Sequence, residues 1–373
     1  MVACCTQGVR EPWSKVKGAS GYYIDYNNTK NEYYSNDKVS NTNSYIIRRV
    51  AAGTYKIRVK AFKKVNGKKY YGKYSSTKTV TIKKSAFRTW NIGADARDTI
   101  YSVDKATAKV KATLYNNGLL EVTGTGDTCD MGGVGTPMWA KYDWMLSRAK
   151  IEKTVQTTNM DFWFKGCYML TTVDRIPSTV ESMESTFSEC DNLLRSPDLP
   201  DTLTDMSSTF EDCWMSETPT IPKHVELMND TFAGCDISVA PTIPDSVTQM
   251  NGTFAGSYIK VAPKIPDNVN TMIATFESCL YLTTAPSYIP EHVSNITELF
   301  TGCIILRGNV LIKGDPQKCN YCVESAGYFA GKGKTFTVQY YKGKWSKVDD
   351  IKAQVKADQY GSHVRFEELA PSN

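Results

Sequence analysis

The chain has few of the residues and motifs on which enzymes depend. Only three of its 373 residues are histidine, the side chain best suited to acid–base work near neutral pH. No nucleophile elbow is present, and the glycine-rich stretches 124–126 and 132–135 are not followed by the Lys-Ser/Thr pair of a phosphate loop. We therefore expect no catalytic residue, no cofactor and no metal site.

Long hydrophobic runs are also missing. No apolar stretch approaches the roughly 18 residues that a membrane-spanning helix needs, although 41% of the residues are hydrophobic. The first eight residues lack the apolar core of about 7–15 residues that marks a secretory signal. The sequence predicts a folded protein that does not insert into a membrane.

Two parts of the chain are poor in charge of one sign. Residues 1–85 hold 18 Lys/Arg and 4 Asp/Glu, whereas residues 160–303 hold 6 Lys/Arg and 20 Asp/Glu. A basic segment can bind anionic partners such as wall polymers, acidic glycans or nucleic acid, or it can simply be a solvated surface. No nucleic-acid module signature is present, so we expect no nucleic-acid partner.

What the sequence does contain is a repeat between Met160 and Cys303. Each copy reads Met-x-x-x-Phe-x-x-Cys, a stretch with proline, and then Ile-Pro-x-x-Val. The Phe position is filled by Phe164, Phe187, Phe210, Phe232, Phe254, Phe276 and Phe300. The Met position is filled by Met160, Met183, Met206, Met228, Met250, Met272 and Ile296. The Cys position is filled by Cys167, Cys190, Cys213, Cys235, Ser257, Cys279 and Cys303. A period of 22–24 residues predicts a solenoid with one coil per repeat.

The repeat also predicts the shape of a coil. Proline makes the residue before it extended, so each Ile-Pro pair should end a strand, and these strands should pair in parallel from coil to coil. The Val, Met and Phe positions are spaced by three and four residues, which predicts one face of a short helical turn. The thiols at the Cys position should be buried, reduced and structural, whereas Cys319-Asn-Tyr-Cys322 gives a weak metal or redox signal.

This block resembles the BspA-like leucine-rich repeat family, whose repeat reads Ile-Pro-x-x-Val-x-x-Ile/Met-x-x-x-Phe-x-x-Cys. The resemblance covers roughly residues 106–314, and seven coils agree in register. It implies a curved, non-catalytic solenoid in a bacterial surface protein, often with several domains, that adheres to host matrix or to other cells.

Residues 12–84 alternate apolar and polar side chains in short runs, which predicts an antiparallel β-sandwich. Trp13 to Tyr22, Ala52 to Ala61 and Gly72 to Ser75 resemble a fibronectin type III domain. That family has a strand before the tryptophan, and the residues before Trp13 suit a strand poorly, so we expect a domain that is truncated at its start.

These observations predict five segments. They are a sandwich at 1–85, a linker at 86–105, a β cap at 106–158, the repeats at 159–314 and an α/β cap at 315–373. The first cap should contain a hairpin around Asn116-Asn-Gly118. The last should contain strands at 334–341 and 363–367 and a helix at 348–359, unless it is a small independent βαβ-like domain.

Two rows of variable residues are candidates for a ligand-binding face. If the Ile of each Ile-Pro pair points inward, the residue before it points outward, giving Arg175, Asp198, Thr220, Thr242, Lys264 and Tyr288. The residue after the Cys position forms the second row: Tyr168, Asp191, Trp214, Asp236, Tyr258 and Leu280. Within it, exposed aromatic rings at Trp214 and Tyr258 would suit protein or glycan contact. These two rings either face solvent or pack across neighbouring coils.

The sequence thus predicts a mainly β, non-enzymatic protein with short helical turns. We expect a bacterial cell-surface or secreted location and a partner that is a protein or glycan on a host or bacterial surface. A bacteriophage virion or tail attachment protein, and an accessory region of a larger surface enzyme, remain alternatives. The oligomeric state is left open.

Overall fold

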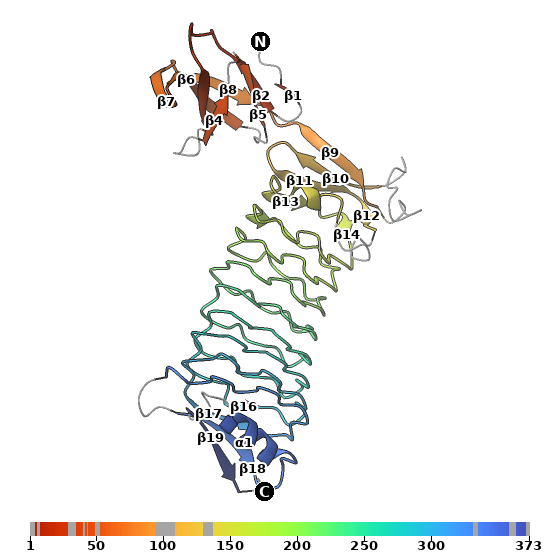
Figure 1. The fold of residues 1–373 in the computed structure, drawn as a ribbon. Coiled ribbons are helices and arrows are strands. Elements are labelled where there is room, and N and C mark those ends of the chain that lie inside the picture. Colours follow the sequence, from red (N-terminus) through yellow and green to blue (C-terminus); the bar gives the residue numbers. More distant parts are fainter. Residues whose placement is uncertain are drawn as a thin grey trace. The chain divides into compact units, whose positions relative to one another are not determined.

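The computed structural model describes residues 4–5, 8–28, 35–39, 42, 44–48, 53–93, 109–129, 137–330, 335–357 and 363–370. Among them the one α-helix is α1 (Val348–Ala357), and the regular structure is otherwise β, with a short 3₁₀ turn at Ala140–Tyr142. The chain forms two compact units: Met1–Trp90 with Ala112–Glu121, and Asn91–Lys111 with Val122–Asn373. The predicted mainly β fold class with a repeat solenoid is confirmed (Figure 1).

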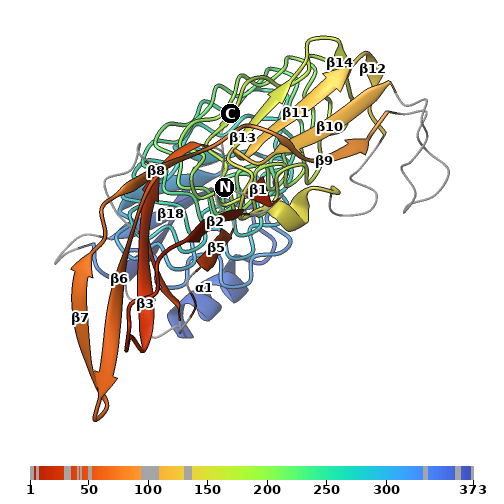
Figure 2. The same ribbon diagram turned by 90° about the horizontal axis from the view of Figure 1, so that it is seen from above.

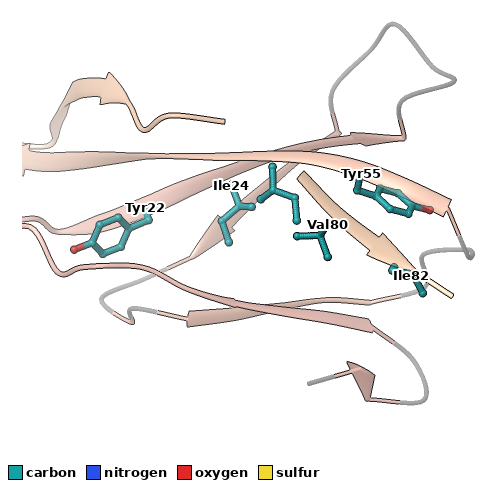
Figure 3. Packing of buried hydrophobic residues seen from close by; sticks show 6 residues of the cluster. Tyr22, Ile24, Tyr55, Val80 and Ile82 are labelled. Atoms are coloured by element: carbon teal, nitrogen blue, oxygen red, sulfur yellow. The ribbon is translucent and has the colours of Figure 1, made fainter. Parts of the chain in front are cut away.

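The first unit contains two antiparallel sheets, as the predicted sandwich requires. One sheet has the order β1 (Cys4–Cys5), β2 (Gly8–Pro12), β5 (Ser44–Arg48). The other has the order β4 (Ser35–Val39), β3 (Gly21–Asn28), β6 (Gly53–Val65), β7 (Lys68–Tyr74), with β8 (Lys78–Ile82) paired to β6. Alternate residues of β3, β6 and β8 form the buried cluster in Figure 3: Tyr22, Ile24, Tyr55, Ile57, Val80 and Ile82.

Two expectations about this region were wrong. The residues before Trp13 do form strands, because β2 pairs with β5 through five residues and also pairs with β1. The predicted linker begins with a strand, β9 (Ala86–Asn91), and the part of it from 94 to 105 lies outside the described residues. Neither strand shows the alternation that marks a half-buried strand, because β2 reads Gly-Val-Arg-Glu-Pro and the apolar Phe87 and Trp90 of β9 are three residues apart.

A five-stranded sheet precedes the repeats. Its order is β15 (Thr172–Val173), β13 (Arg148–Ile151), β11 (Leu119–Gly124), β10 (Val110–Tyr115), β9, and a two-stranded sheet joins β12 (Gly126–Asp127) to β14 (Val155–Gln156). The predicted hairpin is β10–β11, whose turn is closed by the bond from Gly118 N to Tyr115 O (3.0 Å), with Gly118 at a φ of 78°. The glycine-rich stretch 132–135 lies outside the described residues.

The interior of the solenoid is a stack of parallel phenylalanine rings. The seven rings from Phe164 to Phe300 follow one another at centroid distances of 5.5–5.9 Å, with planes within 16° of parallel. All are fully buried, as are the residues at the Met position. The coils overlie one another when viewed along the stack (Figure 2). The periodic apolar residues are therefore the core of the fold.

Two rows of buried polar side chains form hydrogen bonds from each coil to the backbone of the preceding coil. Thr209 Oγ1 donates to Met183 O (2.8 Å) and Cys213 Sγ donates to Phe187 O (3.0 Å). Equivalent bonds recur through most coils, from threonines directly before the Phe position and from the free thiols at the Cys position. Because a buried carbonyl without a partner is costly, these bonds specify the register between coils.

The stretch from the Met to the Cys position is a pair of tight turns. In one coil, Thr186 N bonds to Met183 O and Cys190 N bonds to Phe187 O, and the third residue of each turn, Ser185 and Glu189, has a φ of 50° and 61°. The same two positions have positive φ in all seven coils. The Val, Met and Phe side chains share one buried face, as expected from their spacing. Their backbone, however, alternates between these turns and hydrogen bonds to the next coil.

The parallel ladder between coils does not run where we expected it. It joins the residues just before the Met position, from Asn159 through Ser182 to Thr271, and continues along the Met-to-Cys stretch. At an Ile-Pro pair itself, a regular strand is described at β16 (Tyr288–Ile289), which pairs with β17 (Gly308–Ile312). Between the Cys position and the Ile-Pro pair, β15 pairs with β13, and isolated bridges join Val261, Thr284 and Arg307. The cause is proline, which lacks an N–H and cannot donate to a ladder, whereas the Met-to-Cys stretch contains none.

The solenoid extends one coil beyond the predicted end of the repeats. Residues 296, 298, 300 and 302 donate backbone bonds to residues 318, 320, 322 and 324, and Tyr321 and Ser325 have the positive φ values of the other coils. Cys319, Val323 and Ala326 thus take the Met, Phe and Cys positions, and Cys322 directly precedes the Phe position. The Cys-x-x-Cys spacing is therefore explained by the repeat.

The C-terminal segment continues the solenoid as a parallel sheet. Its order is β16, β17 (Gly308–Ile312), β18 (Phe336–Tyr341), β19 (Val364–Leu369), with α1 between the last two strands. The expected strands and helix are present. Because β18 pairs with β17 through five residues, this βαβ segment adds to the sheet of the last coils.

Candidate binding surface

Exposed apolar side chains of the solenoid gather at one edge of the coils. We call the four residues after each Cys position the post-Cys corner. Among the described residues from 159 onward, all but Tyr321 of the large exposed hydrophobic side chains lie there: Tyr168, Met169, Leu194, Trp214, Val239, Tyr258, Val261, Leu280, Tyr281, Tyr328 and Phe329. Apolar groups gathered on one surface are characteristic of a recognition site.

The post-Cys corners of two central coils border an open groove of about 750 Å³, which we call the Val–Pro groove. It is lined by residues 238–245, 260–264 and 266. Val239 and Val261 stand at equivalent positions of the two coils and are 70% and 56% exposed. Lys260 and Lys264 also line the groove, so two of the six basic residues within 160–303 are placed there.

Prolines limit the backbone pairing between the two stretches that face each other across the groove. Lys260 N donates to Ser238 O (3.3 Å), but the next bond from this stretch, from Ala262 N to Thr284 O, runs to the coil on the other side. Pro241, Pro244, Pro263 and Pro266 remove four backbone donors from the two facing stretches. The two stretches therefore lack donors for a continuous ladder, and their backbone carbonyls and side chains line the groove. Pro197, Pro219 and Pro286 occupy the position of Pro241 and Pro263 in other coils, so the prolines permit the groove without locating it.

The predicted row before the Ile position lies at the surface, but only part of it is free to meet a ligand. Thr242 and Lys264 line the Val–Pro groove, and Asp198 and Thr220 are exposed. The two ends of the row are engaged. Arg175 Nη1 donates to Glu152 O (2.7 Å), and Lys313 Nζ lies 3.3 Å from the centroid of the Tyr288 ring.

The second row shows both of the expected arrangements. Trp214 is 64% exposed. Tyr258 contacts Tyr281 of the following coil, with ring centroids 5.1 Å apart, and yet remains 47% exposed. Trp214 therefore presents most of its surface to solvent, while Tyr258 and Tyr281 together form a small aromatic platform.

Sequence reasoning missed Val239, Val261 and Tyr281. A signal for the two valines was present: at the fourth position after Cys, other coils carry Thr171, Glu217 and Thr283. A branched apolar residue at a position that tolerates polar ones is not needed for the core.

The thiols at the Cys position of the repeat lie in its interior. Burial raises the pKa of the thiols of Cys167 and Cys213 to about 12, so these sulfurs stay protonated and unreactive at neutral pH. His224 and His292 are exposed on turns. Within the part of the chain that the structure describes, no three His, Cys, Asp or Glu side chains gather to hold a metal ion, and no helix could cross a membrane.

Comparison with known proteins identifies the repeats. Residues 141–260 match the protein-family model described as BspA type leucine-rich repeat region, in six copies. This part of the chain is therefore similar to a BspA-type leucine-rich repeat region. No curated protein matches the sequence.

Two solved bacterial structures are similar to the chain. A leucine-rich repeat protein from Bacteroides ovatus ATCC 8483 is 18% identical over 71% of this chain and 74% of its own, with a TM-score of 0.46. One from Eubacterium ventriosum ATCC 27560 is 15% identical over 68% of this chain and 87% of its own, with a TM-score of 0.32.

Proposed function

We propose that the chain is a non-catalytic binding protein of a bacterial cell surface or of the secreted space. The observation that carries this proposal is the separation of roles within each coil. The phenylalanines, methionines and thiols of the repeat are buried, whereas the side chains that vary from coil to coil lie at the post-Cys corner and along the Val–Pro groove. A rigid stack with a variable edge is suited to recognition.

The chemistry of the groove indicates the partner. Two exposed valines and the half-buried Pro244 and Pro263 offer apolar contact. The ammonium groups of Lys260 and Lys264 outnumber the one lining carboxylate, Asp245, and favour an acidic group. An extended protein segment with apolar and acidic side chains fits both features, because its backbone can also bond to the unpaired edge of a coil. The first unit, a sandwich resembling fibronectin type III, serves here as a spacer or second binder.

The test is a binding screen followed by matched variants. The full chain is screened against arrays of matrix proteins, against host and bacterial glycans, and against intact bacteria. For each hit, the pair Val239→Asp/Val261→Asp is compared with the pair His224→Asp/Asn270→Asp, which adds two aspartates at exposed turn positions between the Ile-Pro pair and the Met position.

We expect a protein hit whose affinity falls about tenfold or more in the valine pair and stays unchanged in the control pair. If a glycan binds and its affinity responds to the variants in the same way, the Val–Pro groove is still the binding surface, but the partner is a glycan and not a protein. Failure to retain any partner, or equal loss in both pairs, would contradict the proposal.

A further inference from the structure

One face of the sheet in the first unit carries a compact group of tyrosines and lysines. We call Tyr23, Lys60, Lys69, Tyr71 and Tyr74 the Tyr–Lys patch; they come from β3, β6 and β7. Lys60 Nζ lies 4.4 Å from the centroid of the Tyr74 ring and 5.3 Å from that of Tyr71. Lys69 Nζ donates to Tyr23 Oη at 3.2 Å. These contacts join the side chains into one continuous surface.

The patch is built on a fixed base. The Phe62 ring is buried beneath it, with its centroid 5.4 Å from that of Tyr23 and 6.1 Å from that of Tyr71. Arg58 also reaches this face, where its guanidinium lies 4.1 Å from the centroid of the Tyr74 ring. The tyrosine rings thus restrict the conformations of the lysine side chains. Less side-chain conformational entropy is therefore lost when a ligand binds.

The charge of the patch is not balanced within this part of the chain. Residues 53–85 contain eleven Lys/Arg and no Asp/Glu. Arg58 is paired with the buried Asp25 at 3.2 Å, so the net positive charge resides on the lysines. A hydrogen bond with Tyr74 raises the pKa of Lys60, so that ammonium remains charged throughout the neutral range.

We propose that the Tyr–Lys patch binds an anionic polysaccharide, a linear glycan carrying carboxylate or sulfate groups. Ordered ammonium groups would pair with the anionic substituents, and the tyrosine hydroxyls would bond to sugar hydroxyls. Single-stranded nucleic acid is the less suitable polyanion. Its bases need open aromatic faces, and here the rings are tilted against one another, with cations over Tyr23, Tyr71 and Tyr74. This site is independent of the solenoid groove.

The experiment uses the full chain and four probes of similar length. They are a heparin-derived oligosaccharide, an oligogalacturonate, a neutral dextran oligosaccharide and a single-stranded DNA. Affinity is measured at two salt concentrations for the native chain and for two charge-matched variants. Lys60→Glu/Lys69→Glu alters the patch, and Lys15→Glu/Lys17→Glu changes the same charge at exposed positions elsewhere in the unit. Tyr71→Phe removes a hydroxyl alone, and melting curves verify that each variant folds.

We expect at least one anionic glycan to bind more tightly than DNA and dextran, and its affinity to fall about tenfold or more in the patch variant, with little change in the control. Heparin and galacturonate together distinguish sulfate from carboxylate recognition, and Tyr71→Phe should weaken binding while leaving net charge unchanged. Tighter binding of DNA, or equal loss in both charge variants, would overturn the proposal. Neither result depends on whether the Val–Pro groove binds a protein.

Discussion

The ring of Phe336 lies edge-on against the ring of Phe300, with centroids 5.5 Å apart and planes at 71°. At the other end of the stack, Trp163 meets Phe164 at 72° in the same manner. The row of parallel rings thus ends at a perpendicular aromatic at each side, and these two rings shield the terminal apolar faces that a solenoid would otherwise expose.

Removing one of these end rings should loosen the end that it covers. Phe336→Ala deletes a fully buried ring from β18, and substitutions of this kind cost about 3–5 kcal/mol. Because coils support only their neighbours, we expect faster hydrogen exchange at 296–330 and little change at 183–232. Thr337→Ala, one residue away and half-buried, is the control. An equal increase in hydrogen exchange across the whole solenoid would show that the stability of a coil does not depend only on its neighbours.

A central ring should be costlier to remove than the thiol beside it. Phe232→Ala should lower the free energy of unfolding by about 3–5 kcal/mol, which chemical denaturation measures. Cys235→Ser should be far milder, because a hydroxyl can still donate to Phe210 O, which Cys235 Sγ contacts at 2.8 Å, and Ser257 already occupies this position in the next coil. Equal effects of the two substitutions would contradict the assignment of the ring to the core.

Gly252 is constrained mainly by its neighbour, because other coils, such as the one with Ala274 at a φ of 52°, place non-glycine residues at the same position. Gly252 has a φ of 58°, and a Cβ there would lie 1.9 Å from Asp230 Oδ1 of the preceding coil. Gly252→Ala should therefore destabilise the chain through both strain and a clash, by about 1–3 kcal/mol. In an Asp230→Ala background the clash disappears and the strain remains, so we expect a smaller loss. A double-mutant cycle of unfolding free energies measures the difference, and a cycle with no coupling would contradict the contact.

The carboxyl group of Glu184 gives the solenoid a pH dependence of defined sign. Its pKa is raised by burial and by the nearby charges of Asp161 and Asp205. The folded chain therefore binds this proton more tightly than the unfolded chain, so this group favours folding at low pH and loses that contribution as the pH rises through its folded pKa.

The corresponding prediction is that Glu184→Gln raises the melting temperature at neutral pH. The gain should shrink as the pH falls toward the ordinary range of a glutamate, about 4.3. Glu226→Gln removes the same charge from another coil and serves as the control. A destabilised Glu184→Gln chain at neutral pH would contradict the electrostatic environment described for this carboxyl group.

The parts of the fold that repeat were predictable from the sequence. Phe232, Met228 and Val225 recur at fixed spacing, and such recurrence predicts a shared interior without knowledge of the backbone. The eighth coil was missed because Cys319, Val323 and Ala326 fill the core positions with different side chains. The ladder was misplaced because a period fixes which residues are equivalent in each coil, but it does not locate the backbone bonds between coils.

The candidate surface was predicted only in part. Thr242 and Lys264 line the Val–Pro groove as members of an expected row. The groove itself could not be located from the prolines at 241 and 263, because Pro197, Pro219 and Pro286 occupy the same position in other coils. It appears only when the two coils are placed side by side. Arg175 and Tyr288 were expected to face a ligand, but they are engaged by Glu152 and Lys313, residues remote in sequence.

The central claim is that the repeated side chains are interior scaffolding, which leaves recognition to the outer edge of the coils. Its most direct test is alkylation of the native chain with a small maleimide, read residue by residue by mass spectrometry, with and without denaturant. We predict that Cys167, Cys190, Cys213, Cys235, Cys279 and Cys303 remain unlabelled until the solenoid unfolds. Rapid labelling of several of these thiols in the folded chain would place them on an accessible surface and contradict the account.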